Sequence, residues 1–387
     1  MNVTALAGIT VLEFASYVSG PYAGMLLGDL GATVIKIEHP DGGDPFRGWG
    51  KTDYNPTFGS MNRNKKSVTI DLKSEKGRMQ ARQLARNADV LIENFRAGTM
   101  ERLGLDYEAL AADNPRLIYC SVTGFGSKGP YRDRPGYDTV GQAVSGLLAV
   151  LTDRRAPQPM GISLSDHLTG IFACYGVLAA LMARTTTGRG QRVETSLLQA
   201  SVAFLGENAA NFFEDGHVPT RKTRCMRAQV FAFTAGDSLP FVVHLSSPPK
   251  FWQGLLTATE RQDLGSDERF KTRDARVKNY DALQDELEKV FGTRPRAEWL
   301  ARLGAADVPC GPLNGIDDVF ADPQVQALEM RKVLPHPSRG TIAVVGSAIQ
   351  MSETPPRIES AAPALGADNA SILPSVTEPA SRALPIR

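Results

Sequence analysis

The feature that most constrains the fold is an alternation of short β-rich runs with helix-type segments in the first third of the chain. Residues 9–14 (ITVLEF) and 33–38 (TVIKIE) flank SGPYAGMLLGDLGA, whose small residues have helical spacing. This is the strand, helix, strand unit of a parallel sheet with short joints. Three more strands are predicted at residues 67–72, 89–94 and 117–122, with a helix at 74–87. The repetition predicts an α/β fold with a doubly wound, Rossmann-like parallel sheet.

After the first third, the pattern of predicted elements and the composition of the chain change. The charge-free run 170–183 has 14 residues, fewer than the roughly 20 that span a bilayer, so we expect a buried core helix over 164–183. A further helix is predicted at 194–213 (ETSLLQASVAFLGENAANFF), and a hairpin at 231–245 with GDS as its turn. From Glu353 the chain is rich in Pro, Ala and Ser, which indicates an extended return across the surface.

These changes predict two domains of unequal size. The expected division is a large-domain part at 1–200, a linker at 201–224, a smaller α+β domain at 225–325, and a second linker with a C-terminal return to the large domain at 326–387.

Composition excludes several classes of protein. The chain has 387 residues, with 43 Lys and Arg against 42 Asp and Glu, so it lacks the basic excess of a nucleic-acid binder. Hydrophobic residues make up 42% and charged residues 22%, as in a soluble globular protein rather than a disordered one. No basic residue precedes the first apolar stretch, and the four cysteines form no C-x-x-C pair. We therefore expect a cytoplasmic protein with no membrane contact, disulfide framework or zinc ribbon.

Charge is nonetheless uneven along the chain. Residues 47–102 carry 12 Lys or Arg against 6 Asp or Glu. Because ligands of open α/β sheets bind beyond the carboxyl ends of the strands, this positive region suits a phosphorylated ligand there. An alternative is a solvated helix face, which fits the basic residues of 74–87. The candidate ligand contacts are Arg47, Arg63, Lys65, Lys66, Lys73, Arg96 and Arg102.

Asp166 is the candidate for covalent chemistry. It stands in GISLSDHLTG, in the predicted first turn of the long apolar helix. Acids favour first turns through the helix dipole alone, so a purely structural role is the simplest interpretation. The same field would keep a partly desolvated carboxylate ionised, and such a group is a competent nucleophile toward an activated acyl carbon.

Other chemistry has less support in the sequence. The five histidines show no metal-ligand spacing, so no metal site is expected. No G-x-G-x-x-G follows the first strand, no phosphate-loop lysine motif occurs, and no G-x-S-x-G is present. These gaps argue against a dehydrogenase or a nucleoside-triphosphate enzyme.

Taken together, motifs spread over nearly the whole chain resemble those of the class III coenzyme A (CoA) transferases, the family of formyl-CoA and carnitine-CoA transferases and the α-methylacyl-CoA racemases. They include GDPFRGW, MNRNKKSVTIDLKSEKG, ADVLIENFRAGTMERLGLDYEAL, NPRLIYCSVTGFG, GISLSDHLTG, TGRGQRVETSLLQA and VPCGPLN.

The resemblance implies an acyl-CoA:carboxylate CoA-transferase with Asp166 as the nucleophile. CoA and a carboxylic acid would be substrates, with no tightly bound cofactor, and the dimer would consist of two chains threaded as interlocked rings. The family's CoA pocket and thioester region fall on the following residues of this chain: His39, Lys73, Asn94, Phe95, Arg96, Arg102, Tyr137, and Val18 or Tyr17.

Three departures bear on the reaction. Racemases of the family carry G-H-D where this chain has Gly136-Tyr137-Asp138, and without that His the proton transfers lack a second acid/base group. The glycine-rich loop of formyl-CoA transferases is replaced by residues 244–249, which leaves a lid role there undetermined. Their glutamine near the thioester is Val18 here, so a formyl or oxalyl substrate does not follow.

The alternatives left open are a racemase or an intramolecular CoA-transferring isomerase of the same fold, and a CoA-binding protein without catalysis. The acyl donor and the acid acceptor cannot be read from the sequence. The polar segment 224–227 would suit either a carboxylate acceptor or ordinary surface.

Overall fold

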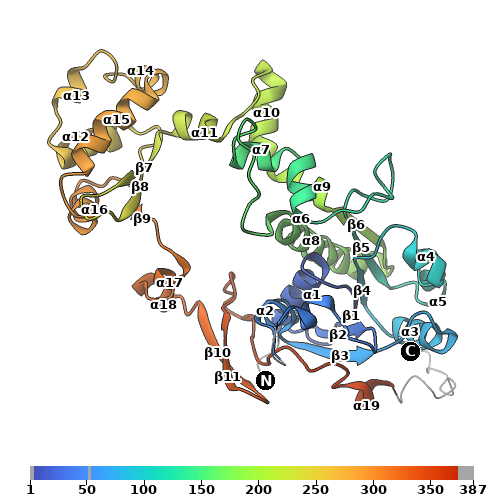
Figure 1. Ribbon diagram of the computed structural model, residues 1–387. Coiled ribbons are helices and arrows are strands. Elements are labelled where there is room, and N and C mark those ends of the chain that lie inside the picture. Colours follow the sequence, from blue (N-terminus) through green and yellow to red (C-terminus); the bar gives the residue numbers. More distant parts are fainter. Residues whose placement is uncertain (1–3, 51–53, 374–387) are drawn as a thin grey trace. The chain divides into compact units, whose positions relative to one another are not determined.

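The structure, a computed structural model, describes residues 4–50 and 54–373 and separates into two compact units (Figure 1). Unit 1 comprises the described parts of Met1–Leu148, Pro159–Gly206 and Gln326–Arg387. Unit 2 comprises Ala149–Gln158 and Glu207–Val325. The domain boundaries expected from the sequence stay predictions.

Unit 1 is built on a six-stranded sheet in the order β3-β2-β1-β4-β5-β6. Every neighbouring pair is parallel, which confirms the predicted parallel α/β sheet. The strands are β1 (Thr10–Phe14), β2 (Thr33–Glu38), β3 (Lys65–Thr69), β4 (Val90–Glu93), β5 (Ile118–Thr123) and β6 (Arg192–Ser196).

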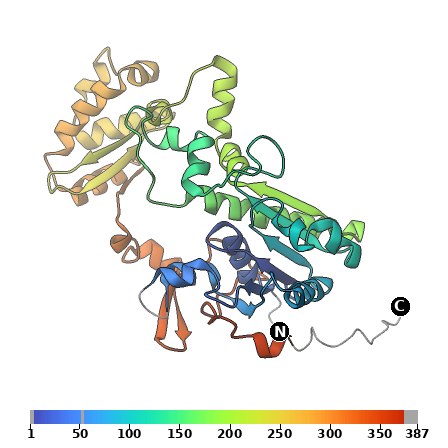
Figure 2. The same cartoon turned by 45° about the vertical axis from the view of Figure 1, so that its right-hand side comes forward.

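Helices cover both faces of this sheet, because the central strands are apolar on both sides and each side must be shielded from water. One face packs on α1 (Ser19–Asp29) and α8 (Leu164–Thr187), with Val11, Ile92 and Cys120 in the shared core. The other face packs on α3 (Glu75–Arg86) and α5 (Tyr107–Asp113), with Leu12 and Leu91 in the core. The two layers flank the arrows of the sheet in Figures 1 and 2.

The remaining elements of unit 1 are shorter. They are the 3-10 helix η1 (Pro45–Trp49), α2 (Pro56–Asn62), α4 (Thr99–Leu103), α6 (Asp138–Val144), α9 (Leu197–Phe204), α19 (Asn369–Ile372), and the hairpin of β10 (Arg331–His336) and β11 (Gly340–Val345). Three helices cross a boundary between the units, α7 (Leu147–Leu151), α10 (Gly206–Asp215) and α18 (Pro323–Ala327).

The long apolar helix α8 extends four residues past its predicted end. Among the described residues, α8 is the one helix whose length and apolar composition alone would allow it to cross a membrane. Here Ala173, Val177 and Ala180 are buried in the core under the sheet, whereas Tyr175 and Met182 are 69% and 70% exposed. The expected core helix is therefore confirmed on one face only.

The helix predicted at 194–213 is wrong at its start and in its middle. Residues 194–196 lie in β6, where Glu194 pairs with Ser121 of β5. The Ser196 hydroxyl then accepts the backbone N–H of Gln199 and starts α9. Helix α9 ends at Phe204 with Leu205 as its C-cap, and a separate helix, α10 (Gly206–Asp215), follows. The charged residues Arg192 and Glu194 alternate with other residues in this edge strand, and the sequence pattern alone predicts the polar first turn of a helix.

The C-terminal segment follows an extended path along β3. The side chains of Asp368 and Asn369 accept the backbone N–H groups of Ser67 and Thr69, both at 2.9 Å. The Arg357 backbone N–H donates to the Asp29 carbonyl at 2.7 Å. The bonds to Ser67 and Thr69 satisfy the outer edge of the sheet, which would otherwise expose unpaired backbone groups.

Unit 2 packs helices on a three-stranded antiparallel sheet in the order β7-β8-β9. The predicted hairpin is confirmed as β7 (Val230–Thr234) and β8 (Pro240–His244), followed by β9 (Cys310–Pro312). Its core is rich in aromatic rings, including Phe233, Phe291 and Trp299. Its other helices are α11 (Arg221–Ala228), α12 (Pro249–Thr259), α13 (Asp263–Ser266), α14 (Arg273–Lys278), α15 (Tyr280–Phe291), α16 (Arg296–Ala305) and α17 (Ile316–Val319).

Candidate active site

The turn between β1 and α1 forms one wall of the site. Asn94, at the end of β4, accepts the Ser16 backbone N–H at 3.0 Å and donates to the Ser16 carbonyl at 2.8 Å. This two-point contact fixes the turn, in which Tyr17 has a φ of +66°. A non-glycine residue adopts that region only where its surroundings hold it. The turn presents the Tyr17 ring edge-on to the ring of Tyr137, with centroids 5.9 Å apart.

Asp166 lies in the first turn of α8, as predicted. Its backbone N–H donates to Oδ1 of Asp138 at 3.1 Å. Oδ2 of Asp138 accepts a 2.5 Å hydrogen bond from the buried Gln142, so Asp138 is held from both sides. The start of α8 is thus bonded to the start of α6 through one carboxylate.

Burial, followed by the charge of Asp138, raises the pKa of Asp166 to about 7, although a hydrogen bond from Ser19 acts in the opposite direction. The sequence argument expected the helix N-terminus to keep this carboxylate ionised. In the structure, burial and the like charge of Asp138 act against that ionisation. A carboxyl group with a pKa near neutral is typical of functional sites.

A cavity of about 170 Å³ at this end of the sheet brings together five of the predicted residues, Asn94, Phe95, Arg96, Tyr137 and Asp166. We call it the sheet-end cavity. Its wall also contains Tyr17, the second option for the thioester region. A carboxyl group and cationic side chains therefore line one space, which suits an anionic ligand.

Sequence reasoning missed several lining residues. Ser19, Arg132 and Arg134 all border the sheet-end cavity. Arg134 lies over the Tyr131 ring at 3.8 Å, and Arg132 pairs with Asp133. The two arginines belong to a loop outside residues 47–102, so the local charge count did not include them.

Four predicted CoA contacts do not line this cavity. Val18 is buried against Phe46 and Phe58. His39 is partly exposed, with Nε2 at 3.8 Å from Oδ1 of Asp71. Lys73 and Arg102 are exposed, and Arg102 donates to the Thr99 hydroxyl. Their roles toward CoA stay predictions.

Three of the other basic candidates are engaged inside the fold, which corrects their assignment as free ligand contacts. Arg47 binds Glu38 through two nitrogens, each at 2.8 Å. Arg63 pairs with Asp29 at 2.6 Å. The local excess of positive charge is accordingly smaller at the surface than in the sequence.

Lys65 is the third, and it belongs to a fully buried ion cluster beneath the β1–α1 turn. Glu13 is paired with Lys65 at 2.7 Å and with Lys36 at 2.9 Å, and Lys36 also contacts Asp44 at 2.9 Å. A Cβ on Gly24 would lie 2.0 Å from a carboxylate oxygen of Glu13, so the helix can pass here only as glycine. Since burial disfavours its charged form, the pKa of Lys65 is lowered to about 8.

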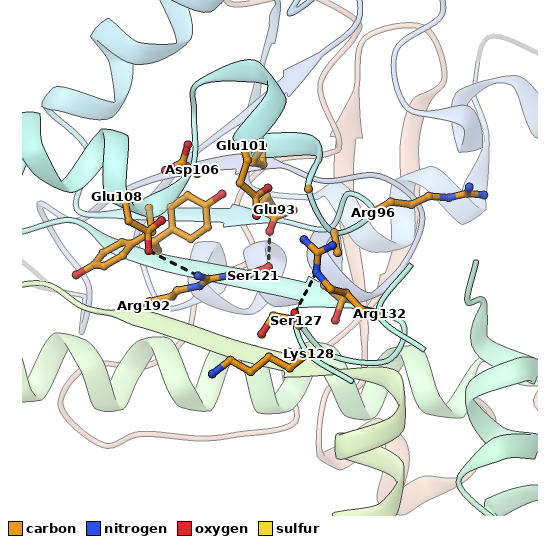
Figure 3. A pocket seen from close by; sticks show the side chains of 16 residues that line it. Glu93, Arg96, Glu101, Asp106, Glu108, Ser121, Ser127, Lys128, Arg132 and Arg192 are labelled. Carbon is orange, nitrogen blue, oxygen red and sulfur yellow. Dashed lines mark hydrogen bonds and ion pairs between the residues drawn. The ribbon is translucent and has the colours of Figure 1, made fainter. Parts of the chain in front are cut away.

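A second cavity of about 170 Å³, whose lining is drawn in Figure 3, shares residues with the first. Arg96, Ala97, Thr123 and Arg132 line both. Its floor holds Glu93, whose carboxylate accepts the Ser121 hydroxyl and, at 2.9 Å, the Phe95 backbone N–H. Burial is the main cause that raises the pKa of Glu93 to about 7.

No three His, Cys, Asp or Glu side chains among residues 4–50 and 54–373 lie close enough to hold a metal ion together. The four cysteines, all within these ranges, are free.

Fold and cavity define a doubly wound α/β protein with a carboxyl group and arginines at the carboxyl end of its sheet. Residues 6–369 match CoA-transferase family III. The chain belongs to this family and is a CoA-transferase by that membership.

Relatives that are named as CoA-transferases match this chain over most of their length. The succinate–glutarate CoA-transferase of Agrobacterium fabrum is 36% identical over 386 residues, covering 95% of this chain and 94% of the relative. The acetyl-CoA:oxalate CoA-transferase of Acetobacter aceti is 38% identical over 329 residues, covering 84% of each. A crystal structure of a CaiB/BaiF family protein from Brucella suis matches with a TM-score of 0.85 at 36% identity, covering 96% of this chain and 99% of that one.

Proposed function

We propose that the chain transfers CoA from an acyl-CoA to a carboxylic acid through covalent intermediates on Asp166. The observation that carries this proposal is the position of Asp166, a partly desolvated carboxyl group in the wall of a cavity lined by Arg96, Arg132 and Arg134. A carboxylate in such a place is exposed to substrate and activated by loss of hydration.

The exchange balances without a redox partner. An Asp166 oxygen attacks the thioester carbonyl, the C–S bond breaks, and CoA leaves as the thiolate while a mixed anhydride forms. The thiolate then attacks the Asp166 carboxyl carbon, releasing the donor acid as its carboxylate and leaving an aspartyl-CoA thioester.

The acceptor carboxylate attacks that thioester and expels CoA thiolate, which gives a second mixed anhydride. Attack of the thiolate on the acceptor's acyl carbon yields the new acyl-CoA and restores the Asp166 carboxylate. Four successive attacks on acyl carbons thus replace the direct transfer of CoA from the donor acyl group to the acceptor carboxylate.

The substrate class follows from the relatives and from the charge of the site. The relatives named above act on succinate, glutarate and oxalate, and three arginines line the sheet-end cavity. We therefore assign a short dicarboxylate as one acid partner. CoA contacts at His39, Lys73, Asn94, Phe95, Arg96, Arg102, Tyr137 and Val18, an interlocked homodimer, a cytoplasmic location and the absence of a tightly bound cofactor belong to the same proposal.

The test is incubation of the purified chain with succinyl-CoA and a mixture of glutarate, oxalate, malate and acetate, followed by mass spectrometry of the thioesters. A new acyl-CoA whose formation requires its acid supports the proposal. Deuterium exchange at an α-carbon without any acceptor acid would identify a racemase instead. CoA binding with no exchange across the acids would leave a binding protein.

A further inference from the structure

Unit 2 contains a hollow of about 630 Å³ that has no part in the transfer chemistry described above. Two segments far apart in sequence form its wall, residues 149–155 and 218–222. We call it the basic hollow. Both segments belong to unit 2, so the hollow lies within that unit.

Its cationic side chains are not neutralised by the fold. Arg154, Arg155 and Arg221 line the hollow, and among the described residues their guanidinium groups form no ion pair or hydrogen bond. Elsewhere in unit 2 comparable arginines are paired, as Arg261 and Arg269 are with Asp263 and Asp267.

The rest of the lining does not offset this charge. Lys222 adds a fourth cation and reaches Asp281 at 2.8 Å, where both side chains are more than half exposed. Asp153 is the acid among the described lining residues, and its Oδ1 accepts the Arg155 backbone N–H at 2.9 Å. The arginines therefore keep their capacity to bind an external anion.

The start of α11 reinforces the same sign of potential. The helix begins at Arg221, and no acidic residue occupies its first turn. The positive end of its dipole is thus directed toward the lining residues Thr220 and Arg221, where it adds to the side-chain charges.

We propose that the basic hollow binds a small anion that carries two or more phosphate or carboxylate groups. Its volume is in the range of pockets that hold small molecules rather than single ions. Three unpaired guanidinium groups match more than one anionic group, because each planar fork can bind a phosphate or carboxylate through two nitrogens.

Calorimetric titration of the full chain with pyrophosphate and, separately, with citrate tests this proposal at matched ionic strength. The variant R154Q/R155Q/R221Q removes the charges of the hollow. The matched control R269Q/K271Q/K289Q removes as much charge from other exposed positions of unit 2. We expect wild type and control to bind alike, and the hollow variant to bind at least tenfold more weakly.

The two probes separate the sources of the anion. Binding of pyrophosphate alone would assign a phosphate ester or nucleotide, and binding of citrate alone a multicarboxylate. Binding of neither probe to the wild type, or equal weakening in hollow and control variants, would overturn the proposal. Circular dichroism checks the folding of each variant, and the single variant R221Q, expected to bind about threefold more weakly, replaces the triple variant if the latter does not fold.

Discussion

The backbone N–H of Asp166 donates to a carboxylate oxygen of Asp138, at 3.1 Å. The bond therefore orients the first turn of α8 by means of a negative charge, and that charge acts on the Asp166 carboxyl group as well. Together with burial it raises the pKa of Asp166 to about 7. In the proposed reaction the ionised form attacks, so we expect the rate to depend on this contact as well as on burial.

Asp138→Asn keeps an oxygen that can accept the Asp166 N–H and removes the charge. Since a neighbouring negative charge disfavours ionisation, we expect the pKa of Asp166 to fall. Because the pKa of Asp166 is raised to about 7, we expect kcat/KM of the wild type to rise with pH around that value, and in the variant this rise should move down by about half to one pH unit. A pH profile of succinyl-CoA turnover measures it. An unchanged profile, or one equally shifted in the exposed control Glu75→Gln, would remove Asp138 from this role.

Lys65→Met tests the buried ion cluster. The substitution leaves Glu13 with one of its two cationic partners, and breaking a buried pair costs about 3–5 kcal/mol. We expect the free energy of unfolding in urea to fall by that amount. Lys66→Met is the matched control, because Lys66 is the next residue in β3 but exposed, and it should change stability by less than about 0.5 kcal/mol. Equal effects of the two substitutions would contradict the assignment.

Glu93 predicts a pH dependence of stability. Its pKa is raised from 4.5 to about 7 in the folded chain, so between these values the folded state holds a proton that the unfolded state has lost. The free energy of unfolding should therefore fall as the pH rises from about 4.5 to 7. Relative to wild type, Glu93→Gln should gain about 2 kcal/mol between pH 5 and pH 8. Urea unfolding at pH 5 and at pH 8 measures the gain. An equal difference in stability between variant and wild type at the two pH values would show that folding does not raise the pKa of Glu93.

How far the sequence predicts this molecule depends on the range of the interactions involved. Strands such as 33–38 and the helix at 74–87 follow from local apolar patterning, and the structure places β2 and α3 within two residues of those bounds. The strand β6 was missed because its pairing with β5, about seventy residues earlier, overrides the local pattern.

Prediction of the site residues likewise depends on whether their interactions are local in sequence. Asp166 and the Asn94-Phe95-Arg96 segment were found from helix position, strand ends and the family resemblance, and the structure places them in one cavity. The buried state of Lys65 and the engagement of Arg63 with Asp29 depend on partners 34 or more residues away, and no local signal marks them. Arg132 was missed because the charge count stopped at Arg102.

The most direct test of the account is mass spectrometry of the chain after brief incubation with succinyl-CoA and rapid quenching, followed by proteolysis. The account predicts a peptide containing Asp166 that has gained one CoA less one water, and predicts its absence in a folded Asp166→Asn variant that has lost transfer. Undiminished transfer by that variant, or an adduct confined to another residue, would contradict it.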